Sequence, residues 1–334
     1  MVKIKCPSDL FELAIRRGGL LRTSELVAAG FSAHQISSQV ANGTLRRCAR
    51  GVIELPDAVA QNIARHGAHQ HNRIQQAYIA VLAAGPTAAA AGQSALVILG
   101  AQGLPPIIRA EFTTKCGGTT GNDAKYHNRR EPYSNFLVTN QVRVLPPELA
   151  LAQAVANLPR NHAVAVMDHM RRSNLLNPAG FELAEQLSAH RPGAALTRPW
   201  WRLSDQRADS PAETFGRLTC HDLNCAPDVL QLKVFNNRGS YVARVDMAWQ
   251  LPDGRWLLGE IDGFKYHSSA AQLQADHHRQ NQLIAPNTML QRWRGADAAD
   301  GTMASQVQRI LRGAKWRPGQ VTSLPGNRIQ LVAS

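Results

Sequence analysis

With 334 residues, of which 44% are hydrophobic, the chain is long enough for two or three domains with apolar cores. Its formal charge of +13 and its pI of about 10.1 favour a polyanionic partner, because cationic side chains neutralise phosphates and release counterions. The longest apolar stretch, residues 88–104, is too short and too polar to span a bilayer, and residues 1–14 lack the pattern of a signal peptide. We therefore expect no membrane association.

The five cysteines are scattered along the chain as Cys6, Cys48, Cys116, Cys220 and Cys225. They are odd in number and include no CxxC pair, which argues against a disulfide framework and against a zinc site. Such a set is typical of a reducing compartment, so the sequence predicts a cytoplasmic protein.

The beginning of the chain predicts short helices. Ser8 is placed to cap a first helix, and the pair Gly18-Gly19 is placed to end it. Thr23 then starts a short second helix with the sequence SELVAAG.

The third helix carries the clearest local signal. It begins at Ser32, whose side chain forms an S-x-x-Q capping box with that of Gln35, and it ends near Asn42-Gly43. The segment TLRRCARGVIEL that follows alternates and breaks at Arg50-Gly51, as a two-stranded wing does. Three short helices and a basic wing predict a winged helix-turn-helix over residues 1–58.

In a winged helix the third helix enters the major groove and the wing meets phosphate or the minor groove. The residues expected at base edges are His34, Gln35, Ser38 and Gln39, and those expected on the wing are Arg46, Arg47 and Arg50. The alternative is a helical scaffold that uses the same face for protein contacts. Amides and hydroxyls on this helix, in place of an apolar stripe, favour DNA.

The same segment resembles a known family. Gly30-Phe31-Ser32, Gly43-Thr44-Leu45-Arg46-Arg47 and Arg50-Gly51-Val52 are similar to the N-terminal domain of the AbiEi-type antitoxins of type IV toxin-antitoxin systems, which act in bacterial defence. The resemblance covers about fifty residues. It implies a winged helix that binds promoter DNA, and a cognate toxin as a second partner.

The middle of the chain, residues 59–205, alternates Ala-rich helical stretches with polar loops. Its segment RVLPPELALAQAVANLPRNHAVAVMDHMRR resembles the linking domain of AbiEi-like proteins, which implies a linking domain of helical and mixed structure. Its histidines His66, His69 and His71 lie among arginines, so a solvated basic face is favoured over a metal site. The loop CGGTTGNDAKYHNRR lacks the G-K-[ST] ending of a phosphate-binding loop and is interpreted as a connection between strands.

Acidic residues mark the C-terminal part. They are Glu213 in a helix, Asp246 in one strand, and Glu260 and Asp262 in the next. The segment Pro252-Asp253-Gly254 suits a three-residue hairpin loop, and the resulting register places Asp246 opposite Glu260. Facing carboxylates repel each other unless a cation lies between them. The sequence therefore predicts that Asp246 and Glu260 bind a divalent metal ion.

This part resembles the PD-(D/E)xK nuclease superfamily and, within it, the bacterial domain related to very-short-patch-repair endonucleases. The matching positions are Ser210 to Glu213, Arg217, Gln231, Arg244 to Trp249, Glu260 to Gly263, Tyr266, His267, Asp276, Arg279, Asn281, Leu283 and Arg292. The resemblance implies a restriction-endonuclease-like α/β domain with a mixed sheet over residues 206–315, followed by a tail over residues 316–334. It also implies DNA hydrolysis with Mg²⁺ or Mn²⁺, with Glu213 binding a second ion or orienting water, and Arg279 gripping phosphate.

One position departs from the superfamily pattern. The usual lysine, two residues after the second carboxylate, is here Asp262, which is included among the catalytic candidates. Lys265 and His267 lie just beyond it and could supply the missing positive group, and the repair endonucleases use histidine. The alternative for the acidic residues is a charged strand face paired with arginines, namely Arg244, Arg255 and Arg279.

Three hypotheses follow for this multidomain α/β chain. The first is a DNA-binding, metal-dependent endonuclease. The second is a non-catalytic, antitoxin-like DNA-binding transcriptional regulator whose C-terminal domain serves as a clamp or a partner surface. The third is an antitoxin that neutralises a nucleotidyltransferase toxin by protein contacts alone. Only the first requires a divalent ion.

Overall fold

The structure is a computed structural model that describes residues 6–120, 125–262, 282–319 and 328–332. Its contacts divide the chain into two compact units. The N-terminal unit contains Met1–Pro159 and Ser173–Pro199, and the C-terminal unit contains Arg160–Arg172 and Trp200–Ser334. The predicted division at residues 58, 205 and 315 is finer than these units and stays a prediction. Among the described residues, no helix is long and apolar enough to cross a membrane.

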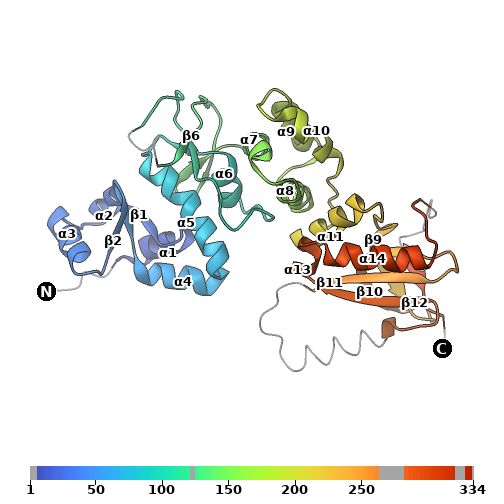
Figure 1. Ribbon diagram of the computed structural model, residues 1–334. Coiled ribbons are helices and arrows are strands. Elements are labelled where there is room, and N and C mark those ends of the chain that lie inside the picture. The colour runs from blue at the N-terminus through green and yellow to red at the C-terminus, as the bar shows by residue number, and fades with distance from the viewer. Residues whose placement is uncertain (1–5, 121–124, 263–281, 320–327, 333–334) are drawn as a thin grey trace. The chain divides into compact units, whose positions relative to one another are not determined.

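The N-terminal unit begins with the elements of a winged helix (Figure 1). They are α1 (Ser8–Arg16), β1 (Leu20–Arg22), α2 (Thr23–Ala28), α3 (Ala33–Ala41), β2 (Arg46–Ala49) and β3 (Val52–Glu54). The three helices and the wing hairpin expected from the sequence are confirmed. Strand β1 was not expected. It pairs with β3, so that the sheet has the order β1-β3-β2.

Capping explains where two of these helices begin. The capping box of α3 is confirmed, because Ser32 Oγ accepts from Gln35 N at 3.2 Å and Gln35 Oε1 accepts from Ser32 N at 2.7 Å. The predicted cap at Ser8 is wrong. Pro7 holds the extended N-cap conformation, so Ser8 is already helical and its hydroxyl donates to Asp9.

The rest of the N-terminal unit is a second small sheet with helices around it. Its elements are α4 (Pro56–His66), α5 (Ala68–Ala83), β4 (Ala89–Ala90), α6 (Gly92–Ile98), β5 (Glu111–Thr113), β6 (His127–Asn128), β7 (Leu137–Thr139), β8 (Val142–Val144), α7 (Pro147–Ala154), the 3₁₀ helix η1 (Val155–Asn157), α9 (Pro178–Ala189) and α10 (Ala194–Arg202), the last of which continues into the C-terminal unit. The strand order is β6-β5-β4-β8-β7. The expected mixture of helices and strands is confirmed, and the glycine-containing loop does connect two strands, β5 and β6.

One expectation for this region is wrong. His71 does not belong to a solvated basic face, because only 4% of it is exposed and its Nδ1 lies 2.9 Å from Asn62 Oδ1. Asn62, itself buried, donates from Nδ2 to the carbonyl oxygen of Ile15, so the pair connects α4 and α5 to α1. Burial lowers the pKa of His71, which keeps the imidazole neutral in this position.

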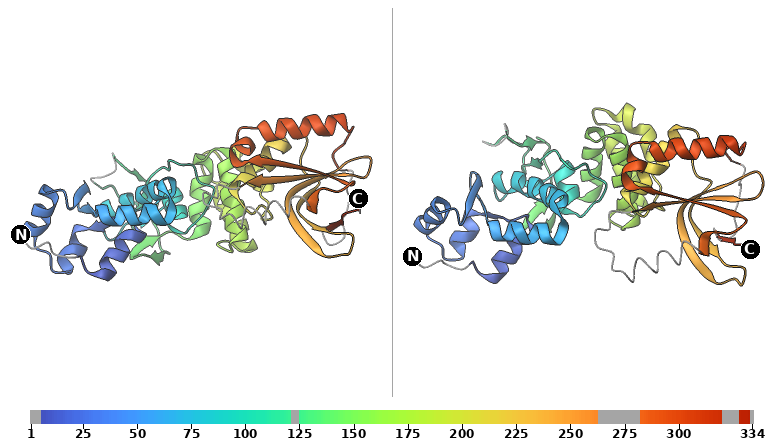
Figure 2. Two further views of the ribbon diagram at one scale, coloured as in Figure 1. Left: turned by 90° about the horizontal axis from the view of Figure 1, so that it is seen from below. Right: turned by 60° about the horizontal axis from the view of Figure 1, so that its bottom comes forward.

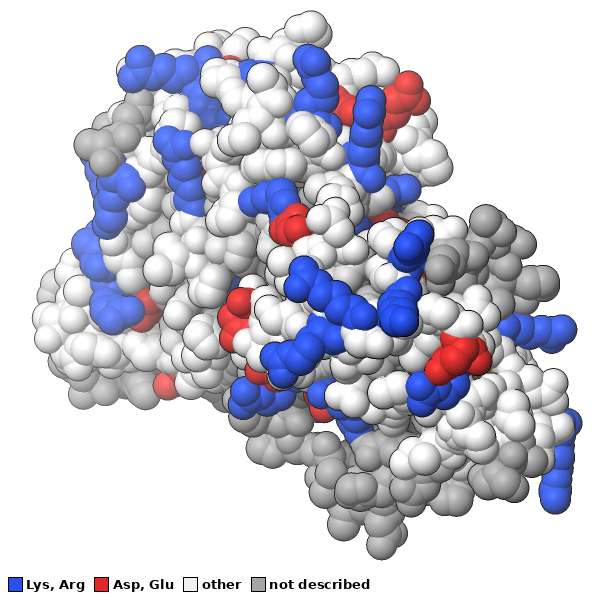
Figure 3. All heavy atoms as spheres, turned by 45° about the vertical axis from the view of Figure 1, so that its right-hand side comes forward, with Lys and Arg blue, Asp and Glu red and all other residues white. Residues whose placement is uncertain are grey.

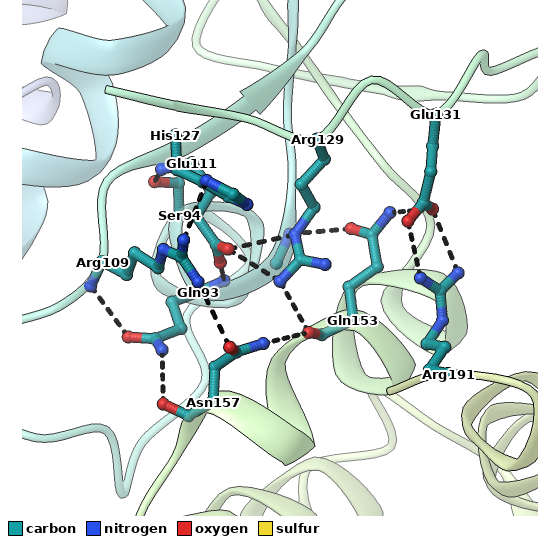
Figure 4. A network of polar contacts seen from close by, with 11 residues as sticks. Gln93, Ser94, Arg109, Glu111, His127, Arg129, Glu131, Gln153, Asn157 and Arg191 are labelled. Atoms are coloured by element: carbon teal, nitrogen blue, oxygen red, sulfur yellow. Dashed lines mark hydrogen bonds and ion pairs between the residues drawn. The ribbon is translucent and has the colours of Figure 1, made fainter. Parts of the chain in front are cut away.

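A buried carboxylate, Glu111, organises the second sheet (Figure 4). It receives two hydrogen bonds from the guanidinium group of Arg129, at 3.0 and 2.7 Å, and one from Gln93 N at 2.7 Å. Gly92 has φ +47, and a Cβ at this position would lie 2.0 Å from Glu111 Oε2, so only glycine fits. Gln153 extends the network by accepting from Gly92 N and donating to Glu131. The cluster is satisfied by its own partners and is structural.

Arg17 connects the winged helix to the second sheet. Its side chain is completely buried, and Nη1 donates to both carboxylate oxygens of Glu25, at 3.0 and 2.8 Å. Its Nε donates to the carbonyl oxygen of Asn140, in the turn between β7 and β8, at 2.9 Å. A single guanidinium group therefore bonds to residues that lie 8 and 123 positions further along the chain.

The C-terminal unit contains a five-stranded mixed sheet. Its elements are α8 (Arg160–Arg172), α11 (Pro211–Asp222), β9 (Val229–Phe235), β10 (Tyr241–Gln250), β11 (Trp256–Asp262), β12 (Thr288–Arg294), α13 (Gly295–Ala299), α14 (Thr302–Gly313) and β13 (Arg328–Gln330). The strand order is β12-β11-β10-β9-β13, with β12 and β13 parallel to their neighbours and the other pairs antiparallel. The mixed sheet expected from the sequence is confirmed, and the three-residue hairpin loop has Gly254 at φ +85.

Two apolar cores cover the two faces of this sheet (Figures 1 and 2). Helices α11, α13 and α14 pack on one face, against side chains that include Leu230, Met247, Trp249, Leu257 and Ile261. The second core includes Leu232, Val234, Ala243, Val245, Leu258, Leu283 and Ile329. We call the first of these the helix side of the sheet.

We expect Arg17→Ala to lower the free energy of unfolding of the N-terminal unit by about 3 kcal/mol, because it removes a buried guanidinium group that bonds to Glu25 and Asn140 and leaves Glu25 only the weaker ion pair with Arg22. The matched control is Arg16→Ala, which removes an exposed arginine from the same helix and should cost much less. Urea unfolding followed by circular dichroism measures both. Equal losses in the two variants would contradict the role of Arg17.

Candidate functional site

Strands β9 and β10 exchange faces at one pair of positions. Leu230 and Met247 pack on the helix side, whereas Leu232 and Val245, two residues away on the same strands, pack in the second core. Residues two apart on a regular strand share a face, so both strands are irregular between these positions. Gln231 has φ +55 there, a left-handed conformation that is rare for a residue with a side chain. A regular alternation of faces along β10, which the sequence YVARVDMAW predicts, is therefore wrong beyond Asp246.

Asp246 occupies this irregularity on β10. The ladder between β10 and β11 ends at the pair Met247 and Gly259, and its register brings Asp246 level with Glu260. In place of a further ladder bond, Asp246 Oδ2 accepts from Ile261 N at 2.8 Å. The two strands thus separate where the carboxylate enters between them.

Glu213 approaches the same place from the beginning of α11. It is buried, and its carboxylate accepts from Asp209 N, Ser210 Oγ and Gln231 Nε2, each at 2.8 Å. Gln231 thus has two roles: its left-handed backbone interrupts the strand, and its side chain donates to Glu213 on α11. Burial is the main cause that raises the pKa of Glu213, and the charge of Asp209 adds to it.

Burial and the charge of Glu213 together raise the pKa of Asp246 to about 7. The hydrogen bond from Ile261 N and the charge of Arg244 act in the opposite direction but do not compensate. No ion pair to Glu213 or Asp246 is found among the described residues. Arg244, the nearby arginine, forms its ion pair with Asp209.

The partners of Glu213 and Asp246 differ from those of two other buried carboxylates, Glu111 and Asp168. Glu111 is held by Arg129, and Asp168 on α8 is held by Arg217 on α11 at 3.0 Å and by Thr214 Oγ at 2.8 Å. Each of those two has a guanidinium partner and a structural role. The pair Glu213 and Asp246 has neutral donors instead, which makes it the candidate functional site.

The remaining acidic candidates lie beside Arg292 on β12. Glu260 is buried, and its Oε2 is 3.6 Å from Arg292 Nε; Asp262 is about half exposed and ion-paired with Arg292 Nη2. Asp262 is thus engaged with a cation. The alternative expected from the sequence, a charged strand face paired with arginines, therefore describes Glu260 and Asp262, although the arginine that pairs with them is Arg292. Of the arginines expected there, Arg255 pairs with Asp253.

The described residues contain no group of three or more His, Cys, Asp or Glu side chains arranged to hold a metal ion. The donors available are carboxylate oxygens, the type that Mg²⁺ prefers, and their uncompensated charge is of the sign that a cation neutralises. Four further candidates, Lys265, His267, Asp276 and Arg279, lie outside the described residues.

The DNA-binding candidates lie on α3 and the wing. His34, Arg47 and Arg50 are exposed, whereas Ser38 and Gln39 are partly buried. The amide oxygen of Gln35 is occupied by the capping box. Arg46 is ion-paired with Glu54 at 2.7 Å, although its own side chain remains largely exposed. The structure thus leaves His34, Arg47 and Arg50 best presented to a ligand.

Comparison with known proteins bears on this first module. Residues 8–52 match the family model of the AbiEi antitoxin transcriptional regulators. The match covers the three helices and the wing up to the start of β3. No curated protein and no solved structure matches the chain. The N-terminal module is thus similar to a DNA-binding regulator domain, and the C-terminal unit is known from its own geometry alone.

Sequence reasoning missed two residues of the site. Asp209 contributes a backbone donor and a charge, and its only signal was its place directly before the Ser210-Pro211 helix start. Asp168 anchors α11 from a helix more than forty residues earlier in the chain, and nothing in its local sequence indicates a partner so distant.

We expect Asp246→Asn to raise the thermal midpoint at about pH 8 and to have less effect at about pH 5. The pKa of Asp246 in the folded chain, about 7, lies above its ordinary value, so the stabilisation that its protonated form contributes is present at low pH and is lost as the pH rises through 7. Asparagine stays neutral and can still accept from Ile261 N.

The control for this measurement is Asp253→Asn. Its ion pair with Arg255 lowers the pKa of Asp253, so neutralising it should give no gain at about pH 8. Differential scanning calorimetry across the range measures both variants. A gain for Asp246→Asn that is the same at both pH values would contradict the burial of a charge at this position.

Proposed function

We propose that this protein binds DNA through its winged helix and hydrolyses DNA phosphodiester bonds in its C-terminal unit with Mg²⁺ or Mn²⁺, in the cytoplasm. The observation that carries the catalytic part is the pair of carboxylates Glu213, which is buried, and Asp246, which is partly buried. The pKa of each is raised by burial, the charge of Glu213 raises that of Asp246 further, and no ion pair to either is found among the described residues. Glu260 lies level with Asp246 on the neighbouring strand.

Keeping two such groups buried costs folding free energy. An ionised carboxylate loses its hydration on burial, and a second negative charge nearby increases the cost. A chain that needed only stability would place an arginine there, as this chain does at Glu111 and Asp168. A cation bound from solution removes the repulsion and also supports chemistry at phosphate.

In this proposal Asp246 and Glu260 hold the metal ion, and Glu213 orients water or binds a second ion. A bound Mg²⁺ would lower the pKa of a water molecule and neutralise charge that develops on the phosphate. The backbone of Ile261, held by Asp246, fixes the separation of β10 and β11 at the site. Gln231 fixes Glu213 by its hydrogen bond at 2.8 Å.

The proposed DNA contacts have electrostatic support. The chain carries a formal charge of +13, and Lys and Arg side chains are spread over the face drawn in Figure 3, with acidic side chains lying beside basic ones. Arg47 and Arg50 are exposed on the wing. Phosphate neutralisation by such residues supplies affinity, and the exposed His34 is placed to read a base edge.

A second candidate is a non-catalytic, antitoxin-like transcriptional regulator. It is favoured by the match of residues 8–52 to AbiEi antitoxin regulators. It is also favoured by Asp262, which takes the position of the superfamily's lysine and is neutralised by Arg292. In this case the winged helix binds promoter DNA, the C-terminal unit serves as a clamp, and a cognate toxin is the further partner.

We expect the protein to cleave supercoiled plasmid with Mg²⁺ or Mn²⁺, and the double variant Asp246→Ala, Glu260→Ala to be slower by about a hundredfold or more, because it removes the proposed ion ligands. Agarose gels with time points and an EDTA control measure this. The matched control is Asp253→Ala, an exposed aspartate on the same hairpin, which should cleave like the wild type. Intact plasmid with either ion would favour the regulator.

We expect the double variant Arg47→Ala, Arg50→Ala to bind duplex DNA more weakly, and the slope of log affinity against log salt to fall by about 1.8 if each arginine neutralises one phosphate. Fluorescence anisotropy over a range of salt concentrations measures both. Arg65→Ala is the control, because Arg65 is equally basic but is ion-paired with Glu12, away from the wing. An unchanged slope in the wing variant would contradict wing contact with DNA.

A further inference from the structure

Three basic residues form a row across one end of the C-terminal sheet. Lys233 on β9 is paired in register with Arg244 on β10 and with Arg328 on β13. Paired residues on neighbouring strands point to the same face, so the three cationic side chains lie side by side. Their neighbours Val234, Ala243 and Ile329 are buried in the second core, so the row lies on the opposite face, the helix side, where all three residues are exposed.

Two aromatic residues adjoin the row. Phe235 and Tyr241 are paired across β9 and β10, next to an irregularity in the register, and their rings meet edge to face with centroids 5.8 Å apart. The guanidinium group of Arg328 lies 5.9 Å from the centre of the Phe235 ring. Tyr241 is 59% exposed, so much of its ring is accessible to a ligand.

Lys233, Phe235, Tyr241 and Arg244 line an open groove of about 640 Å³. We call these four residues and Arg328 the basic-aromatic strip. Like charges paired across strands repel each other, and Arg244 alone of the three has an acidic partner, Asp209, in the residues that the structure describes. The groove therefore combines uncompensated positive charge with an exposed aromatic ring.

We propose that the basic-aromatic strip binds single-stranded DNA, with phosphates on Lys233 and Arg328 and an unpaired base stacked on Tyr241. Aromatic side chains beside a positively charged groove are the combination that holds single strands, because every base offers a ring face and every nucleotide offers a phosphate. The stacked bases of a duplex present no such face to a side chain. Charge complementarity thus selects nucleic acid, and the exposed ring selects an unpaired strand.

The strip is continuous with the acidic site. Arg244 pairs with Asp209, whose backbone N–H donates to Glu213, so the strip begins where the buried carboxylates lie. On the helix side of the sheet, Leu230 and Met247 pack under the helices before the face exchange, and Lys233 and Arg244 are exposed beyond it. A strand on the strip would lead toward the candidate active site. This inference deepens the proposed function by naming its substrate, and the two can be tested separately.

The test is anisotropy of a labelled oligothymidylate of about 20 nucleotides, in EDTA, with the full chain carrying the wing substitutions Arg47→Ala and Arg50→Ala. We expect Tyr241→Ala to weaken binding by about tenfold, and Tyr241→Trp to retain it, because tryptophan also stacks. The pair Lys233→Ala, Arg328→Ala should lower the salt slope by about 1.4, the value for two phosphates of a single strand.

The matched control for charge is Arg255→Ala, an exposed arginine on the same sheet outside the strip, which should bind like the background. A duplex of equal length and an oligouridylate provide the other arms. The proposal is overturned if Tyr241→Ala binds the single strand as the background does, if duplex binding falls equally, or if only RNA binding responds. Plasmid cleavage is scored separately, so a chain that never cuts DNA can still bind through the strip.

Discussion

The left-handed backbone at Gln231 is the constraint on which the C-terminal unit depends. A residue with a side chain pays about 1–2 kcal/mol for this conformation, and here it makes β9 change face between Leu230 and Leu232. Strand β10 changes face with it at Asp246. Without this exchange, the apolar residues that follow would point away from the second core, and Asp246 would remain in a regular ladder.

The exchange also fixes the electrostatics of the site. It directs Gln231 toward Glu213 and lets Asp246 reach the backbone of Ile261, so both carboxylates are held by neutral donors. Neutral donors orient a carboxylate but compensate its charge less than a guanidinium group does. The result is a pair of carboxylates held by neutral donors, whose charge no ion pair among the described residues compensates, at the point where two strands separate.

The parts of the fold that sequence reasoning predicted are those with local signals. The capping box at Ser32, the glycines after α1 and the loop that ends at Gly254 each act within a few residues, and each was recognised. The face exchange carries no such signal, because Gln231 is not a glycine and its conformation is imposed by two cores. The burial of Arg17 has no local signal either, since its partner Asn140 is 123 positions away.

The chain uses two strategies for buried charge, and the contrast separates structure from candidate function. Two of the buried charges form ion pairs, Arg17 with Glu25 and Arg129 with Glu111. Each carboxylate is compensated by an arginine of the fold, so both pairs have a structural role. The acidic pair at Glu213 and Asp246 and the row of cations on the strip are each repulsive within themselves. The two lie next to each other, with Arg244 and Asp209 at the border. A ligand that is itself an anion and arrives with a divalent cation relieves both repulsions at once, and a DNA strand with its bound metal ion meets that description.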